Sequence, residues 1–349
     1  MIDDRNFMTA LLGIVAVIAV GVVLDAAQVV ILPLMIAWLL SYIFAPVVRR
    51  LIRYHINIGF AVMCVILFLL AVCYLGGMFV YARVASFAQE YEAYAQRFTE
   101  ISADITTRLP YIKSSLAEVD WLQLAGKRIV AFSGSFVGFV SNLVMVLIFL
   151  VFMLLGKPYM KAKIRYAFPG GRSARVTDVL DSIAGQISRY LTAKLVISLI
   201  TGLLVWGAMT AIGVDFPMTW GAIAFFLNFI PTIGSIIAGI PPTLMALVQF
   251  YPNYWMAVLT ALIFMIIQVV MGNGVEPKMM GERLNLSPLV VLIALVFWGW
   301  LWGFIGALLA VPIAAAIKIV CENIEPLRPI SIMMESGKRF WREEAQEGA

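Results

Sequence analysis

The chain alternates long apolar runs with shorter polar segments. The apolar runs cover residues 7–24, 27–48, 56–81, 129–155, 195–213, 217–249, 255–271 and 288–320. Apolar runs of about 18 residues or more are typical of membrane-spanning helices. The pattern therefore predicts an all-α polytopic membrane protein. We expect about six full spans, plus two longer segments that are interrupted or form re-entrant helical hairpins.

Composition agrees with a membrane protein and excludes several kinds of site. The chain is 62% hydrophobic and 13% charged, whereas about a quarter of the residues in a soluble domain are charged. With 3 cysteines and 1 histidine, it holds no disulfide framework, no four-thiolate metal site and no HExxH zinc site. The GxxxxGK[ST] phosphate-binding motif is also absent. We therefore expect no enzyme, no metal and no cofactor.

Basic residues lie beside the apolar runs and predict the orientation of the chain. Arg49, Arg50 and Arg53 follow the second run, and the segment 156–194 is strongly basic. Loops rich in Lys and Arg stay in the cytoplasm. We therefore expect cytoplasmic N- and C-termini. The net charge of +5 reflects this topology, and we expect no nucleic-acid partner.

Two polar regions have helical patterns. In residues 82–128, apolar side chains step by three and four along one face, which needs a partner in this chain or in a neighbouring subunit. These side chains are Val84, Phe87, Tyr91, Tyr94, Phe98, Ile101 and Ile105. In residues 156–194, an apolar stripe from Val176 to Leu191 lies opposite Arg175, Asp178, Ser182 and Gln186. This second pattern predicts a helix along the membrane surface, whose basic residues contact lipid headgroups rather than a solute.

The segment 217–249 carries no charge and is too long for one straight span. As a single helix it would extend about 50 Å, against an apolar bilayer core of about 30 Å. Its middle contains Asn228, Pro231, Gly234 and Pro241, which interrupt helices or suit a polar break. Pro231 and Pro241 have no N–H, so we expect free carbonyls at Leu227 and Ile237.

The run 255–271 leads into a second group of helix-breaking residues. Gln268, Gly272 and Glu276 are spaced by four and form one stripe if the helix continues. Pro277 then leaves the carbonyl of Asn273 without a donor. Unwound backbone at membrane depth is tolerated where it lines protein or a watery cavity, and paired breaks of this kind indicate a secondary transporter.

The segment 288–320 is the second long interrupted stretch, broken at Gly299, Gly303 and Gly306 with Pro312 further on. If both long segments are re-entrant hairpins, the first enters from outside and the second from inside. If each is a kinked span, the C-terminal tail is still cytoplasmic, whereas Lys278 and Arg283 are outside.

Glu276 is the carboxylate closest to these breaks. A carboxylate in or near a membrane is costly and marks a cation site, a proton relay or a paired charge. Lys278 and Arg283 are close in the sequence and are candidate partners. The structural role of a paired charge at the membrane edge therefore stays open beside the functional one.

Three segments around the breaks are recognisable. They read NFIPTIGSIIAGIPP at 228–242, GNGVEPKMMGERLNLSPLVV at 272–291 and FWGWLWGFIGALLAVP at 297–312. Together with the order of the spans, they resemble the autoinducer-2 exporter family, whose members move small molecules or ions through the bacterial inner membrane. The resemblance covers nearly the whole chain, although residues 82–128 match no motif.

The resemblance implies a site, an assembly and a location. It places a polar turn at Asn228 to Pro231, the pair Pro241 and Pro242, and the residues Gly272, Asn273, Glu276 and Pro277 at the transport core. It implies a multi-pass protein of the bacterial inner membrane that forms a homo-oligomer, expected to be a pentamer. Some relatives export the quorum-sensing signal autoinducer-2, and others are described as sodium or lithium/proton antiporters.

Two transport hypotheses therefore stand side by side. In the first, the protein exports a small polar molecule such as autoinducer-2 by alternating access, and Asn228, Gln268 and Asn273 bind its hydroxyl groups together with freed carbonyls. In the second, it exchanges a monovalent cation for protons at Glu276. A third hypothesis is a passive pore or an oligomeric scaffold without transport.

These expectations divide the chain into regions along the sequence. They are scaffold spans 1–81, an extracytoplasmic helical region 82–128, a fourth span 129–155, a basic cytoplasmic amphipathic helix 156–194, a transport core 195–320 and a cytoplasmic tail 321–349.

Overall fold

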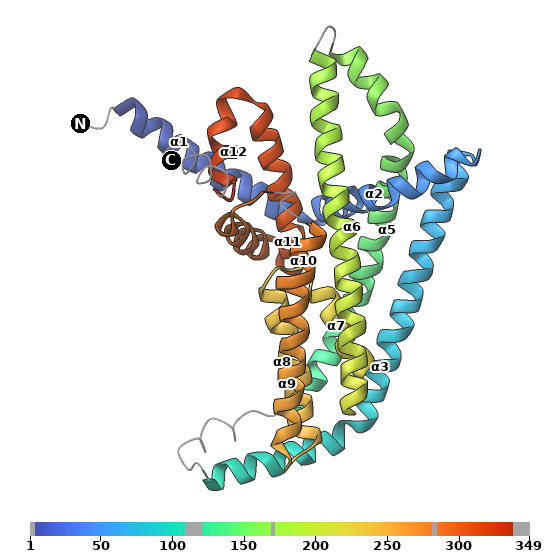
Figure 1. Ribbon diagram of the computed structural model, residues 1–349, viewed down its shortest axis with the longest axis vertical. Coiled ribbons are helices and arrows are strands. Elements are labelled where there is room, and N and C mark those ends of the chain that lie inside the picture. Colours follow the sequence, from blue (N-terminus) through green and yellow to red (C-terminus); the bar gives the residue numbers. More distant parts are fainter. Residues whose placement is uncertain (1–3, 109–120, 169–171, 281–284, 338–349) are drawn as a thin grey trace. The chain divides into compact units, whose positions relative to one another are not determined.

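The computed structural model describes residues 4–108, 121–168, 172–280 and 285–337. Within these ranges all regular elements are helices, which confirms the all-α prediction (Figure 1). They are α1 (Asp4–Ala26), α2 (Gln28–Arg53), α3 (Ile58–Arg108), α5 (Trp121–Ala167), α6 (Arg172–Ile212), α7 (Pro217–Leu227), α8 (Ile233–Gln249), α9 (Tyr254–Val269), the π-helix η2 (Val270–Val275), α10 (Glu276–Met280), α11 (Pro288–Asn323), the 3-10 helix η3 (Glu325–Leu327) and α12 (Arg328–Met334).

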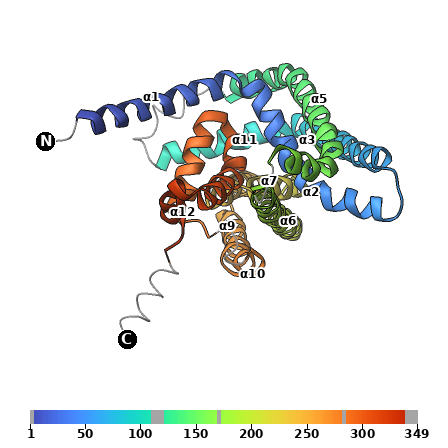
Figure 2. The ribbon, with the colours of Figure 1, turned by 90° about the horizontal axis from the view of Figure 1, so that it is seen from above.

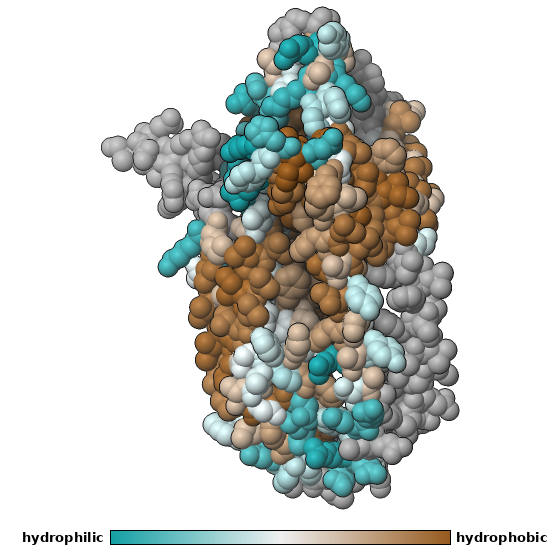
Figure 3. Space-filling view, turned by 90° about the vertical axis from the view of Figure 1, so that its right-hand side faces the viewer, coloured by the Kyte–Doolittle hydropathy of each residue, from teal (hydrophilic) through white to brown (hydrophobic). Residues whose placement is uncertain are grey.

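Six helical segments in the described part of the chain are long and apolar enough to cross a membrane. They are Gln28–Arg53, Ile58–Arg83, Ser141–Ala167, Ser173–Ile212, Tyr254–Met279 and Pro288–Asn323. Their lipid-facing character shows in large apolar side chains that remain exposed, such as Leu203 at 51% and Val296 at 66%. Figure 3 shows hydrophobic side chains over much of the visible face. The protein is therefore a multi-pass membrane protein.

The chain forms two compact units, each made of discontinuous segments. Unit 1 contains residues 1–63, 141–191 and 283–349, and unit 2 contains residues 64–140 and 192–282. The helices α3, α5 and α6 each pass from one unit into the other. Each unit therefore has its own core.

The core of unit 1 is formed by α2, the first half of α6 and α11. Ile187 is fully buried there, beside Leu39 of α2 and Leu309 of α11. The Trp302 indole donates a hydrogen bond to the Leu24 carbonyl of α1 at 3.3 Å. The apolar stripe predicted for residues 176–191 thus packs against protein.

Most of the region 156–194 is helical. In the described residues it is the end of α5 followed by the first half of α6, which continues without a break to Ile212. Its apolar face is covered by α2 and α11, and its polar face lines a cavity of about 500 Å³ with the end of α11. Arg175 donates a hydrogen bond to the Asn323 carbonyl at 3.0 Å. This basic side chain therefore binds the end of α11 and is also exposed to solvent.

The core of unit 2 surrounds a helical hairpin made of α7 and α8. Ala224 of α7 and Ala238 of α8 are buried, and they pack with Val205 of α6 and Phe264 of α9. Small residues allow helices to approach closely inside a membrane. Figures 1 and 2 show α9, η2 and α10 as one continuous column, upright in the first view and nearly end-on in the second.

Both long apolar segments are broken where the sequence predicted. Residues 228–232 separate α7 from α8, and α11 is bent at Trp302 and Gly303, where Gly303 has a φ of 62°. At each break a glycine lies directly against an earlier carbonyl. A Cβ on Gly234 would lie 1.8 Å from the Leu227 oxygen, and a Cβ on Gly306 would lie 1.8 Å from the Trp298 oxygen. The backbone therefore reverses tightly at both places.

Replacing Gly234 with Ala should prevent this reversal. The added methyl group meets the Leu227 carbonyl oxygen and carbon, so the backbone has to shift, and overpacking of this kind costs about 1–3 kcal/mol or more. We expect a clear loss of thermal stability and of monodisperse protein in detergent. Gly207→Ala in α6 is the matched control, since no atom lies within 4 Å of its Cβ position. Equal melting temperatures for the two variants would contradict the tight turn.

Candidate functional site

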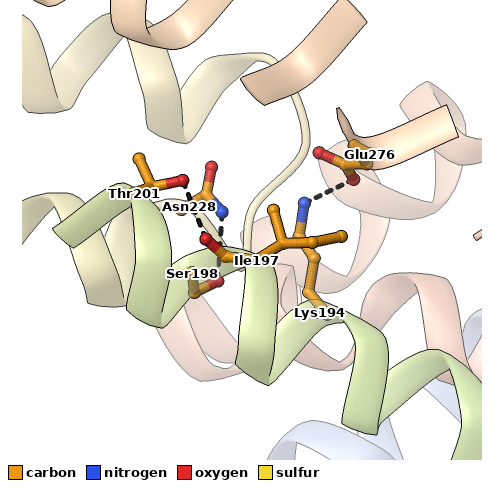
Figure 4. Close-up of polar contacts among 6 residues, drawn as sticks. All are labelled: Lys194, Ile197, Ser198, Thr201, Asn228 and Glu276. Carbon is orange, nitrogen blue, oxygen red and sulfur yellow. Dashed lines mark hydrogen bonds and ion pairs between the residues drawn. The ribbon is translucent and has the colours of Figure 1, made fainter. Parts of the chain in front are cut away.

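A stripe of buried polar residues runs along one face of α6 in unit 2. Lys194, Ser198 and Thr201 follow each other at helical spacing and are exposed by 1%, 0% and 0%. Thr201 donates its hydroxyl hydrogen to the Ile197 carbonyl of its own helix at 2.9 Å. Figure 4 shows that Lys194 and Ser198 instead reach groups on other elements.

Lys194 forms an ion pair with Glu276. Its Nζ lies 2.6 Å from Glu276 Oε1, and the two side chains are exposed by 2% and 25%. A buried ammonium needs an opposite charge or several acceptors, because burial in apolar surroundings is costly for an isolated ion. Glu276 supplies that charge from the start of α10, so the pair is electrically neutral as a unit.

Asn228 lies at the tip of the α7–α8 hairpin and binds the same face of α6. Its side chain is buried, and its Nδ2 donates to Ser198 Oγ at 3.0 Å. Ser198 is one helical turn from Lys194, so the hairpin tip and the Lys194–Glu276 pair meet neighbouring turns of α6. The sequence placed Asn228 and Glu276 at one site, and α6 is the element that connects them.

The turn at the hairpin tip uses most of its own backbone groups. The Leu227 carbonyl, expected to be free because of Pro231, accepts a hydrogen bond from the Ile230 N–H at 2.9 Å. The Gly234 N–H donates to the Ile230 carbonyl at 3.2 Å. The expectation of a free Leu227 oxygen was therefore wrong, because a tighter turn replaces the lost α-helical bond.

The second group of breaking residues adopts a π-helix instead of an unwound loop. Gly272 and Asn273 lie in η2, and the Glu276 N–H donates to the Met271 carbonyl, five residues earlier. Single π-turns inside α-helices are rare and are frequent at functional sites. The helix thus continues from Gln268 to Glu276. Because Pro277 has no N–H, it donates to neither Gly272 nor Asn273.

Gln268 has an unused hydrogen-bond donor. Its Nε2 is buried and has no partner among the residues that the structure describes. A buried amide without a partner costs free energy and calls for a water or a ligand. Of the other predicted residues, Pro231 and Pro241 are half-buried, whereas Gly272, Asn273 and Pro277 are exposed.

Lys194 is a site residue that the sequence pattern does not single out. The pattern groups it with the basic residues of 156–194, which predict headgroup contacts, and offers Lys278 and Arg283 as partners for Glu276. Lys278 is exposed, and Arg283 lies outside the described residues. A signal was available, because Lys194 directly precedes the run 195–213 and has Ser198 and Thr201 on its own face. Its partner lies 82 residues away, which sequence spacing does not reveal.

Comparison with known proteins decides the family. Residues 11–325 match the model of the family described as "AI-2E family transporter". The chain belongs to this family. The AI-2E relatives include a candidate transport protein of Borreliella burgdorferi, 32% identical over 88% of this chain and 85% of the relative. They also include the AI-2 transport protein TqsA of Escherichia coli, which is 39% identical over 56% of this chain and 55% of the length of TqsA.

A third AI-2E relative covers the chain from end to end. The Escherichia coli protein YhhT, named as a candidate transport protein, is 27% identical over 96% of both chains. The family resemblance inferred from the motifs is thus confirmed, and membrane transport is the general activity of the AI-2E family.

Removing the Lys194 charge should destabilise the protein. Lys194→Met leaves the Glu276 carboxylate without its partner, and breaking a buried pair in this way costs about 3 kcal/mol. We expect a lower melting temperature, partly restored in the double variant Lys194→Met/Glu276→Gln, because the unpaired charge is then gone. Differential scanning fluorimetry in detergent measures this.

Lys161→Met is the control for this prediction. Lys161 pairs with Asp181 at 2.7 Å, but both side chains are more than half exposed, and exposed pairs contribute at most about 1 kcal/mol. If Lys194→Met melts at the same temperature as Lys161→Met, the Lys194–Glu276 ion pair does not stabilise the protein as we expect.

Proposed function

We propose that this AI-2E protein exports a small, uncharged polar molecule, of the kind represented by autoinducer-2, across the bacterial inner membrane by alternating access. The main support for this proposal is the cluster of polar residues on α6, where Asn228 binds Ser198 and Glu276 binds Lys194. Polar groups of this density among membrane helices are costly and mark a pathway or a binding site.

The chemistry of the cluster suits a neutral solute with several hydroxyl groups. The ion pair has no net charge, and the amides of Asn228 and Gln268 can each donate to or accept from a hydroxyl. The unpaired Gln268 Nε2 is a donor that such a solute would satisfy. The E. coli relative TqsA is named as an AI-2 transport protein, and autoinducer-2 is therefore the first solute to test.

The Lys194–Glu276 pair weighs against cation exchange as the main activity. Glu276 already has an ammonium 2.6 Å away, so a sodium or lithium ion would have to displace the buried lysine that this carboxylate neutralises. Glu276 as a shared cation and proton site remains the alternative that transport measurements should exclude.

The hairpin geometry supports alternating access. The chain enters and leaves the α7–α8 hairpin at one end, where the Gln249 side chain bonds the Gly213 carbonyl at 2.8 Å. Its tip contacts Ser198, about 21 Å along α6 from Ile212. We propose that this hairpin is re-entrant, that the bent α11 is its counterpart, and that each subunit of a homo-oligomer, expected to be a pentamer, carries its own pathway.

Removing the Asn228 amide should slow transport. In proteoliposomes loaded with autoinducer-2, Asn228→Ala should lower efflux by about tenfold, since a hydrogen bond in a buried site is worth about 1–3 kcal/mol when its partner is left unpaired. Asn253→Ala is the matched control, because Asn253 is exposed and makes no side-chain cap bond. Parent-like efflux from Asn228→Ala would contradict the site.

The same vesicles separate the two transport hypotheses. A sodium gradient should drive no proton movement through the parent protein, and autoinducer-2 efflux should persist without sodium. Sodium-dependent proton movement that is abolished by Glu276→Gln, together with an absence of autoinducer-2 efflux, would replace solute export by cation exchange.

A further inference from the structure

The helix α3 continues well beyond its apolar span. The span ends at Arg83, and we call residues 84–108 the α3 extension. It is the first part of the polar region 82–128, which neither the motifs nor the candidate site explains. Figure 1 shows the extension turning away from the span and passing the ends of α8 and α9.

Two side chains of the extension bind the ends of the α7–α8 hairpin. The Tyr94 hydroxyl donates to Asp215 Oδ2 at 2.6 Å, and the Arg97 guanidinium donates to the Gln249 carbonyl at 2.8 Å. Asp215 lies in the linker 213–216 that leads into α7, and Gln249 is the last residue of α8. The extension therefore binds both the segment that enters the hairpin and the segment that leaves it.

The two ends are also bonded to each other. The Asp215 N–H donates to Gln249 Oε1 at 2.8 Å, and Gln249 Nε2 donates to the Gly213 carbonyl at 2.8 Å. The Trp220 indole donates to the Asp215 carbonyl at 2.7 Å. We call this group of bonds the hairpin base. Hydrogen bonds that involve a charged group are the stronger ones, so Tyr94–Asp215 and Arg97–Gln249 add substantially to it.

Tyr94 is suited to remain a hydrogen-bond donor. Burial raises the pKa of its phenol, and the hydrogen bonds and negative charges of Asp215 and Glu90 raise that pKa further. Glu90 Oε2 lies 2.9 Å from the Tyr94 oxygen on the same helix. The Tyr94 ring also lies 6.2 Å from the Phe216 ring, centroid to centroid, so the contact has an apolar part that does not depend on the hydroxyl.

We propose that the α3 extension is a strap that closes the base of the α7–α8 hairpin and limits its movement during transport. The tip of the hairpin is held by Asn228, and the strap holds the opposite end. The effect on transport rests on the proposed function, whereas the strap itself does not. Its removal should loosen the linkers 213–216 and 250–253 while α9 keeps its protection.

Hydrogen exchange measured by mass spectrometry on the full-length protein in nanodiscs tests the strap directly. Tyr94→Phe removes the hydroxyl that binds Asp215. Arg97→Ala removes the guanidinium that binds the Gln249 carbonyl. We expect amides in both linkers to exchange about tenfold faster in each variant, since local opening follows the free energy of the lost bonds. Tyr81→Phe is the control, because Tyr81 lies on α3 within the span and is 78% exposed.

Parent-like exchange of the linkers in both variants, or equal acceleration in Tyr81→Phe, would overturn the strap. Efflux of autoinducer-2 from vesicles that contain Tyr94→Phe or Arg97→Ala then tests its consequence. Both variants should release autoinducer-2 faster than Tyr81→Phe, and efflux equal to that of Tyr81→Phe in both would overturn the limit on hairpin movement. If no variant transports autoinducer-2, the proposed function fails while the exchange result still decides the strap.

Discussion

Polar groups among membrane helices have to find partners inside the protein, because hydrocarbon offers none. This constraint organises unit 2. Lys194 is almost fully buried and pairs with Glu276, and Asn228 is buried and pairs with Ser198. Both pairs join a broken or irregular helix to the regular helix α6. The irregular elements are therefore fixed in position by the same bonds that make their presence in a membrane tolerable.

The hairpin α7–α8 is held at two ends by different chemistry. Its tip is held by the amide-to-hydroxyl bond from Asn228 to Ser198 and by the close approach of Gly234 to Leu227. Its base depends on a group of charged and amide hydrogen bonds around Asp215 and Gln249. Under the proposed function, the tip exchanges its side-chain bond for a solute while the several bonds of the base keep that end closed.

Local chemistry made much of the fold predictable. Charge-free runs gave the membrane helices, and proline and glycine located both breaks, at residues 228–232 and at Gly303. Three features were not accessible in this way. The partner of Glu276 is distant in sequence, the π-turn at Gly272 and Asn273 depends on which carbonyl each N–H reaches, and the covered face of residues 176–191 depends on α2 and α11. Each is decided by tertiary packing, which periodicity alone does not encode.

An experimental density map of the protein in a lipid nanodisc with autoinducer-2 bound would decide whether this cluster is the transport site. We expect solute density within hydrogen-bonding distance of at least two of Asn228, Gln268 and Glu276, beside the α6 face that carries Lys194 and Ser198. A map in which residues 217–249 form one straight helix, or in which the solute binds away from all three side chains, would contradict it.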